Sequence, residues 1–326
     1  MGEQIEGERQ RVVVLGTGGT IAGCAATGPD NIGYTAAQVD VADLLFGIDA
    51  PAGITLAAEQ VAQVDSKDMS FDIWRTLALR CAHWLEQGDV AGIVITHGTD
   101  TLEESAFFLQ SVLAPVKPVV LTCAMRPATA RNPDGPQNVR DAIAVAATPG
   151  ARGVMVTCAG TVHSAFDVQK THTYRLDAFG SGDAGPVGYV EEGSVRCIRN
   201  WPAAPTGSAE GAIDLIANAR SWPRVEIVMS HAGARGTLVD ALVRAEAIDG
   251  LVLAATGNGT LHHELEAAAL RAQDSGIAVV RATRCASGRI LPRPHQRLRD
   301  AGALSPVKAR IALMLELLGC APCLPR

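Results

Sequence analysis

Short apolar runs that end abruptly in small and hydroxylated residues recur along this chain, and the clearest of them is Ile93–Ile95. A β-branched run of this kind is typical of a strand that is buried on both faces. Thr101, followed three residues later by Glu104, forms a capping box that predicts the start of a helix. This order of strand, turn and helix places Thr99 and Asp100 at the carboxyl edge of a parallel sheet, where open α/β folds bind ligands.

The same alternation of apolar strands and amphipathic helices predicts two α/β domains. We expect a larger N-terminal domain (residues 1–200) with a doubly wound parallel sheet, a linker (201–223), and a smaller flavodoxin-like α/β domain (224–326). One predicted helix is amphipathic and carries Ile73, Leu77, Cys81 and Leu85 on one face. The other predicted helices are 39–46, 101–112, 139–146 and 307–318. The predicted strands are 12–15, 56–64, 93–95, 119–122, 153–158, 225–229, 250–254 and 278–280.

Four glycines surround Thr17 and Thr20 directly after the first predicted strand. Glycine adopts backbone conformations closed to other residues and lets a ligand approach the main chain. A dinucleotide fingerprint would need a glycine where Ile21 stands, and a P-loop would need a Gly-Lys-Ser/Thr sequence that does not follow. The segment therefore predicts a flexible turn with two hydroxyl groups at a strand end.

A loop from Gly23 to Thr35 has no periodicity and is positioned to close over such a site as a lid; it carries Tyr34 near its end. Ser66 follows the second predicted strand, so three strand ends of one sheet bear serine, threonine or aspartate, which favours a shared site. Simpler interpretations remain open. Ser66 or a neighbour can cap the next helix, Tyr34 alone is more often a packing residue, and Lys170 alone reads as a solvated surface charge.

Composition narrows the range of functions. The 326 residues can bury a substantial core, and 48% hydrophobic with 4% aromatic residues suits tightly packed α/β layers. The formal charge of −6 argues against a general nucleic-acid partner, and no apolar run approaches the roughly 20 residues of a membrane span. The first ten residues are polar and lack the apolar core of a secretory signal, so we expect a frayed tail and a cytoplasmic protein.

Eight cysteines in a chain of this length do not form a disulfide framework. One lone pair, Cys320 and Cys323, cannot complete a four-ligand zinc site, so we expect no metal. The other six are spread one per element and are interpreted as small buried thiols: Cys24, Cys81, Cys123, Cys158, Cys197 and Cys285.

Taken together, several motifs resemble the bacterial-type L-asparaginase/glutaminase family, in the same order and at comparable spacing over nearly the whole chain. The Ala-Met-Arg-Pro form is more similar to the high-affinity, type II-like group of that family than to its allosteric group. The motifs are Thr17–Ala22, His97–Thr101, Cys123–Pro127, Asp134–Pro136, Asp167–Thr171 and Gly257–Gly259.

The resemblance implies hydrolysis of L-asparagine to L-aspartate and ammonia through a threonine acyl-enzyme, with glutaminase activity left open and no cofactor. Thr20 would be the nucleophile, with Tyr34 assisting its activation. Thr99, Asp100 and Lys170 would form a second triad. In it, Lys170 would draw the proton from Thr99, and Asp100 would hold Lys170. Threonine is a weak nucleophile that needs such a base.

The resemblance also implies how an amino-acid amide would be held. Ser66 and Asp100 would grip its α-carboxylate and α-ammonium, and backbone groups near Thr99 and Ala124 would contact the amide and its developing oxyanion. The implied substrate contacts are Gly19, Ser66, Lys67, Gly98, Thr99, Asp100 and Ala124.

Three positions depart from the family pattern. Lys67 stands where the high-affinity enzymes usually carry a glutamine, and Thr260 replaces a common asparagine. No glutamate lies between Glu266 and Glu316, although a neighbouring subunit of the family normally lends one to the site. We therefore hypothesise that recognition of the α-ammonium is altered while the threonine chemistry is intact.

Alternatives to an asparaginase are an amidohydrolase for a related carboxamide, a subunit that releases ammonia for tRNA-dependent amidation, and a non-catalytic amino-acid-binding protein on the same fold. A subunit for tRNA-dependent amidation would need an added nucleic-acid-binding module, for which we expect no room in this chain. A binding protein would not need two nucleophile candidates. The resemblance further implies a homotetramer, a dimer of dimers with sites at subunit interfaces.

Overall fold

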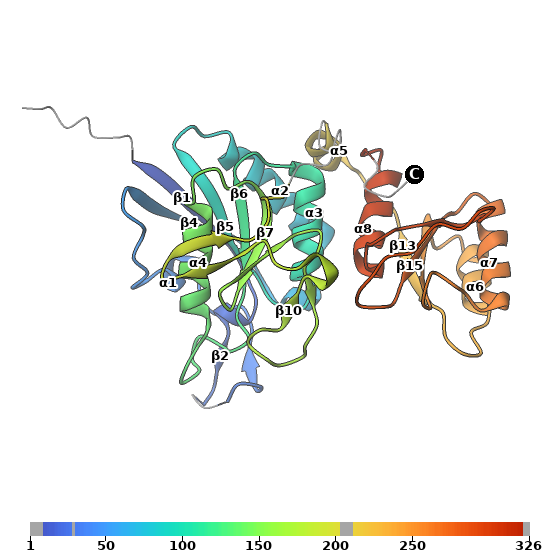
Figure 1. Cartoon of the computed structure of the whole chain (residues 1–326), viewed down its shortest axis with the longest axis horizontal. Helices are drawn as coiled ribbons and strands as arrows, with labels where there is room; N and C mark the ends of the chain where they lie inside the picture. The colour runs from blue at the N-terminus through green and yellow to red at the C-terminus, as the bar shows by residue number, and fades with distance from the viewer. Residues whose placement is uncertain (1–8, 28–29, 203–210, 322–326) are drawn as a thin grey trace, which may run out of the picture. The chain divides into compact units, whose positions relative to one another are not determined.

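The computed structural model describes residues 9–27, 30–202 and 211–321 and divides the chain into two compact units, Met1–Ala204 and Pro205–Arg326 (Figure 1). The expected frayed tail falls mostly on residues 1–8, outside the described residues, while Gln10 already belongs to the first strand. Within the described ranges, no helix combines the length and apolar character that crossing a membrane requires.

The sheet of the first unit is mixed. Its strands β7, β6, β5, β1 and β4 lie in that order and run parallel, as predicted. Strands β8, β11 and β12 extend the sheet from β7 by antiparallel pairing. The bounds are β1 Gln10–Gly18, β4 Ile54–Val64, β5 Val90–Thr96, β6 Pro118–Thr122, β7 Gly153–Cys158, β8 Thr161–Ser164, β11 Gly188–Glu191 and β12 Ser194–Cys197.

Helices cover both faces of this sheet, as a doubly wound fold requires (Figure 1). Val12 and Val14 share a fully buried cluster with residues of α1 and α4. Because side chains alternate along a strand, Val13 and Leu15 face the other side, toward α2 and α3. The bounds are α1 Val41–Leu44, α2 Phe71–Leu85, α3 Leu102–Leu113 and α4 Gly135–Ala146.

Short elements modify the predicted loops. The stretch predicted as an irregular lid contains a small antiparallel hairpin, β2 Cys24–Ala25 with β3 Tyr34–Thr35. Helix α4 begins four residues before the predicted start at Val139, inside the predicted turn. A second two-stranded pair joins β9 Gln169–Lys170 to β10 Phe179–Gly180. Three single 3-10 turns lie at Thr20–Ala22, Ser66–Asp68 and Gly182–Ala184.

The second unit contains four parallel strands in consecutive order, β13-β14-β15-β16. The three strands predicted here are confirmed. Helix α5 was not predicted and lies inside the stretch assigned to the linker. The bounds are α5 Ala212–Asn218, β13 Val225–Met229, α6 Thr237–Arg244, β14 Gly250–Ala255, α7 His263–Asp274, β15 Ala278–Thr283, β16 Arg299–Asp300 and α8 Pro306–Leu317.

The cysteines within the described residues are free thiols, but they are not uniformly buried. Cys81, Cys123 and Cys158 are buried as expected and Cys24 is half-buried, whereas Cys197 and Cys285 are exposed. The prediction was wrong for the last two because they lie in polar edge segments rather than in core elements. The Cys320–Cys323 pair cannot be described as a pair, since residue 323 lies outside the described residues.

Candidate active site

The carboxyl ends of β1 and β5 mark the point where the order of the sheet reverses. The chain leaves β1 toward β4 on one side and leaves β5 toward β6 on the other, so these adjacent strand ends form a topological switch point. Ligands of open α/β sheets bind in the crevice at such a point. Thr20 follows β1 and Thr99 follows β5, so the strand order alone brings both threonines to this crevice.

Glycines allow the two strand-end loops to touch through their backbones. Gly19 has a φ of +83°, and a Cβ added to it would lie 2.3 Å from Cα and N of Gly98. A Cβ on Gly98 would in turn lie 2.5 Å from Oγ of Ser66. A side chain at Gly19 would therefore displace backbone atoms of Gly98, and one at Gly98 would displace the side chain of Ser66. The close approach brings the segments that carry Thr20, Ser66 and Thr99 together.

The hairpin after the first loop brings a tyrosine to the first threonine. The hydroxyl of Tyr34 lies 2.6 Å from Oγ1 of Thr20, and either group can donate the hydrogen bond. The ring also packs against Gly23, where an added Cβ would lie 2.8 Å from the ring carbon Cδ2. Tyr34, which was weak evidence by itself, therefore directly contacts the candidate nucleophile.

The second threonine contacts a lysine that comes from a distant segment. Nζ of Lys170 donates to Oγ1 of Thr99 at 2.8 Å and to Oδ1 of Asp100 at 2.7 Å. Its backbone N–H donates to a carboxylate oxygen of Glu103 at 3.2 Å, which ties the β9 segment to α3. The Lys170 side chain is only 20% exposed, so its interpretation as a solvated surface charge was wrong.

Hydroxyl groups around Ser66 link the third strand end to the site. Oγ of Ser66 accepts a hydrogen bond from N–H of Asp100 at 3.1 Å, and the hydroxyl of Thr101 donates to O of Ser66 at 2.7 Å. The predicted capping box is therefore wrong in its chemistry: α3 starts after Thr101, but this side chain makes no capping bond. Likewise, the next helix is capped by Ser70 and not by Ser66.

A buried relay of hydrogen bonds supports the Gly98 carbonyl. Nδ1 of His97 lies 2.7 Å from O of Gly98, and Nε2 lies 2.8 Å from Oγ of Ser105, which accepts from Nε1–H of Trp74 at 2.8 Å. A carbonyl only accepts, so Nδ1 carries the proton, and in the neutral form of His97 Nε2 accepts from the Ser105 hydroxyl. Burial lowers the pKa of His97 to about 4, which is consistent with that form.

The two threonines, with Tyr34 and Lys170, line a pocket of about 230 Å3. Its charged residues are Asp65, Asp100 and Lys170, which gives a formal charge of −1 and suits a ligand that carries an ammonium group. The volume is below the roughly 300–1,000 Å3 typical of drug-sized ligands and fits a small amino acid. The lining residues are Thr20, Asn31, Ile32, Tyr34, Asp65, Ser66, Thr99, Asp100, Met125, Lys170, Thr173 and Tyr174.

Several expected contacts lie outside this lining. Gly19, Gly98 and Ala124 are buried next to it. Lys67 is exposed, and its ammonium group pairs with Asp68 and, at 3.9 Å, with Asp65.

Other lining residues were not among the expected contacts. Asn31 and Ile32 lie in the stretch predicted as a lid, and Thr173 and Tyr174 follow the Lys170 motif. In the sequence, these four residues are distinguished only by lying in or next to segments that were assigned to the site. Among the described residues, groups of three or more histidine, cysteine or acidic side chains that could hold a metal ion are absent.

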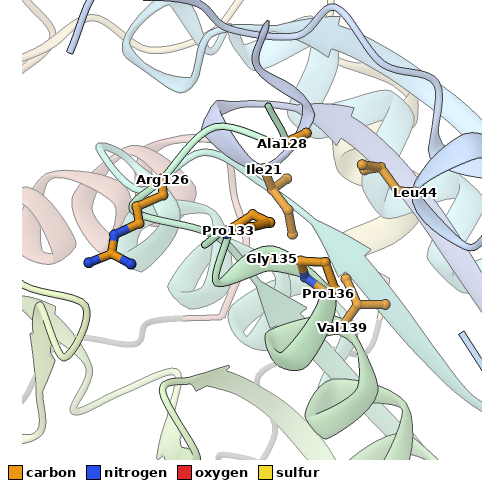
Figure 2. Close-up of a pocket in the computed structure, with 8 residues that line it drawn as sticks. All are labelled: Ile21, Leu44, Arg126, Ala128, Pro133, Gly135, Pro136 and Val139. Carbon is orange, nitrogen blue, oxygen red and sulfur yellow. The ribbon is translucent and has the colours of Figure 1, made fainter. Parts of the chain in front are cut away.

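A second, smaller hollow of about 50 Å3 lies beside Ile21, the residue after Thr20 (Figure 2). Apart from Arg126, its walls are apolar or backbone groups. The Arg126 guanidinium points away from the other labelled side chains and donates to O of Asn132 at 3.0 Å. This hollow therefore offers space but no reacting group. Its lining is Ile21, Leu44, Arg126, Ala128, Pro133, Gly135, Pro136 and Val139.

Comparisons with known proteins agree over almost the full length. The family model "Asparaginase, N-terminal" matches residues 11–203, and the model "Glutaminase/Asparaginase C-terminal domain" matches residues 224–319. An L-asparaginase 2 of Bacillus subtilis is 36% identical over 93% of this chain and 81% of its own length. A glutaminase-asparaginase of Pseudomonas fluorescens is 36% identical over 94% of this chain and 86% of its own length. The crystal structure of a probable cytoplasmic L-asparaginase from Campylobacter jejuni superposes with a TM-score of 0.86 at 34% identity, covering 94% and 95% of the two chains.

Proposed function

The chain belongs to the asparaginase family, and on that premise we propose that it hydrolyses L-asparagine to L-aspartate and ammonia, with L-glutamine as a second substrate. The observation that carries the proposal is the convergence on one pocket of Thr20 with Tyr34 and of Thr99 with Lys170 and Asp100. Each threonine hydroxyl lies within hydrogen-bond reach of a group that can take its proton, as nucleophilic catalysis by a weak nucleophile requires.

In the first half of the proposed reaction, Oγ1 of Thr20 attacks the side-chain amide carbon as its proton passes toward Tyr34 at 2.6 Å. The carbon–nitrogen bond then breaks, ammonia leaves with an added proton, and an ester of Thr20 remains. Backbone N–H groups near Thr99 and Ala124 stabilise the oxyanion, which is the role that fixed donors at a strand–helix turn suit best.

In the second half, water attacks the Thr20 ester and releases L-aspartate. Thr99 and Lys170 relay the proton that this water gives up, and Asp100 holds Lys170 in place at 2.7 Å. Ser66 accepts a bond from the Asp100 backbone, so its own O–H is a donor to the substrate carboxylate. The negative pocket and Asp100 receive the α-ammonium.

Ammonia release from L-asparagine by the purified protein tests this proposal. We expect Thr20→Ala and Thr99→Val each to lower kcat by about 100-fold or more, since each removes a hydroxyl that the chemistry needs. Thr129→Ala is a matched control, because that residue is exposed and, among the described residues, its hydroxyl accepts a single hydrogen bond, from N–H of Ala25 at 2.8 Å. Absence of ammonia from every amide tried would favour the non-catalytic binding protein.

A second candidate is an amidohydrolase with altered α-amino recognition, favoured by the missing glutamate between Glu266 and Glu316 and by Lys67. Turnover of succinamate, which lacks the α-amino group, should then rival that of L-asparagine, and Lys67→Gln should change their ratio. A preference for L-asparagine that this substitution leaves unchanged would contradict the second candidate.

Two further expectations rest on the relatives. A cytoplasmic location is supported by the Campylobacter jejuni structure, described as probably cytoplasmic, although a relative from Haemophilus influenzae is described as probably periplasmic. Cell fractionation decides between them. The type II-like subgroup also remains a proposal, and KM for L-asparagine is the measurement that tests it.

A further inference from the structure

Two cysteines lie side by side next to the pocket, and the proposed reaction uses neither. Cys123 directly follows β6, and Cys158 ends β7. The strands pair in parallel with Thr122 opposite Thr157, so the register brings residues 123 and 158 together. Their Sγ atoms are 3.7 Å apart, and the two residues are 0% and 3% exposed.

One asparagine fixes the frame around both thiols. Nδ2 of Asn138 on α4 donates to O of Cys123 at 2.8 Å, while its Oδ1 accepts from N–H of Ala159 at 3.0 Å. The two strand ends that carry the cysteines are therefore tied to the same side chain. The sulfur atoms must approach by about 1.7 Å to reach the roughly 2.0 Å of a disulfide, a movement within the range of side-chain rotation and small backbone shifts.

A hollow of about 770 Å3 comes close to one of the thiols. Asn138, Ala159 and Leu176 line this hollow. Sγ of Cys158 lies 3.9 Å from Nδ2 of Asn138 and 3.7 Å from O of Leu176, directly behind two of these wall residues. Cys158 is therefore the thiol that a small oxidant reaches first.

We propose that Cys123 and Cys158 form a disulfide on contact with a hydroperoxide, and that this bond lowers catalysis. The Cys158 thiolate attacks a peroxide oxygen, the O–O bond breaks, and a sulfenic acid and hydroxide form. The Cys123 thiolate then attacks the Cys158 sulfur, the S–O bond breaks, and a second hydroxide leaves. The two thiol protons convert both hydroxides to water, and two electrons pass from the dithiol to the peroxide.

The bond acts on the pocket through the residue that follows Cys123. Asn138 holds O of Cys123, and Asp134 holds N–H of Met125 at 2.9 Å, so a shift at Cys123 is transmitted to Ala124 between these anchors. A displacement of about 1 Å near reacting groups can cost 100-fold in rate. This effect on catalysis rests on the proposed function, whereas formation of the bond does not.

The surroundings of Cys123 disfavour its thiolate form. The hydrogen bond with Cys158, burial and the Asp134 carboxylate raise the pKa of Cys123, and the charge of Lys170 only partly opposes them. Because Cys123 must be a thiolate to attack the Cys158 sulfur, closure of the disulfide is slow at neutral pH and accelerates in alkaline buffer.

The test treats the full-length protein with hydrogen peroxide, blocks remaining thiols by alkylation, and maps linked peptides by mass spectrometry. We expect a 123–158 link with loss of two hydrogen atoms, together with a loss of asparagine turnover on the order of tenfold that dithiothreitol reverses. Cys123→Ala and Cys158→Ala should resist the treatment. Cys197→Ser and Cys285→Ser, which alter exposed thiols, should behave like the unmodified protein.

Each result bears on one half of the proposal. Absence of the 123–158 link in the unsubstituted protein, while exposed thiols are oxidised, overturns it even if the alanine variants fail to fold. If peroxide inactivates the alanine variants as strongly as the unsubstituted protein, the link is not the cause of the lost turnover. The same conclusion follows if the link forms and asparagine turnover does not fall. A protein that forms the link but never releases ammonia would instead contradict the proposed function.

Discussion

Asn31 carries a buried side-chain oxygen at the edge of the reacting groups. Oδ1 of Asn31 has no hydrogen-bond partner within residues 9–27, 30–202 and 211–321, although the residue lines the pocket. An unsatisfied buried acceptor costs about 1–3 kcal/mol. The neighbouring Asp30 fixes the turn by accepting from N–H of Ile32 and Gly33 at 2.9 and 2.7 Å. A substrate ammonium group would satisfy this oxygen.

We therefore predict that Asn31→Ala raises KM for L-asparagine by about tenfold and leaves kcat nearly unchanged, since it removes a binding contact of about 1.4 kcal/mol. KM for succinamate, which has no ammonium group, should not change. Ile32→Ala is the control, because this neighbour lines the pocket but is 80% exposed. An equal rise for both substrates would indicate a packing role instead.

His97 couples stability to pH through burial. Its folded pKa is about 4 against an ordinary value of 6.5, so between these values the unfolded chain binds the proton and the folded chain does not. Stability from this group is therefore complete above pH 6.5 and falls as pH drops toward 4. The loss amounts to about 3 kcal/mol at pH 4.

Urea unfolding at pH 7 and pH 4 measures this linkage. Other acidic groups also lose stabilising contacts over this range, so the difference from His97→Gln isolates the histidine. The substituted protein should lose about 3 kcal/mol less between the two pH values than the unsubstituted one. His263→Gln, at an exposed histidine, should leave the loss unchanged. Equal losses in all three proteins would contradict the buried neutral form of His97.

At the level of elements, the contact between the β1 and β5 loops is the most demanding feature. Gly19→Ala combines a positive φ with a Cβ only 2.3 Å from backbone atoms of Gly98. We expect it to lower the free energy of unfolding by more than about 2 kcal/mol and turnover by about 100-fold. In Gly88→Ala the added Cβ meets nothing within 4 Å, so activity should be retained. Chemical denaturation and ammonia release measure both effects.

The sequence was sufficient for elements with strong periodicity. The strand at Ile93–Ile95 and the three strands of the second unit lie where their apolar runs predicted them. Side-chain partners were less accessible, because they depend on tertiary neighbours. Thr101 bonds O of Ser66 instead of capping α3, since the backbone of a neighbouring strand end offers that acceptor. The short strands β8, β11 and β12 lacked long apolar runs.

The site residues also divide into those that a local pattern predicts and those that depend on tertiary neighbours. Thr20, Thr99 and Asp100 could be assigned to strand ends from pattern alone, whereas Lys170 has no local signal and entered only through family resemblance. Its role depends on pairing of β9 with β10 and on the backbone bond to Glu103, which no local pattern encodes. Asn31 could not be predicted as a site residue for a related reason. Whether its side-chain oxygen has a hydrogen-bond partner depends on residues that are distant in the sequence.

At the level of the whole molecule, the family resemblance implies four subunits. Light scattering on the purified protein should give a mass four times the 33.9 kDa of one chain. Dilution into the nanomolar range should lower activity if the sites need a neighbouring subunit. A fully active monomer would contradict the tetramer and would also remove the significance of the missing glutamate.

The lysine that holds Thr99 has a practical consequence for anyone who attaches this protein to a polymer or a solid support. Only four lysines occur in the sequence, Lys67, Lys117, Lys170 and Lys308, and the third lines the pocket. Activated esters aimed at amines thus have few targets, one of them where inactivation would follow. Coupling in the presence of saturating L-aspartate should shield that amine and direct the reagent to the exposed Lys67.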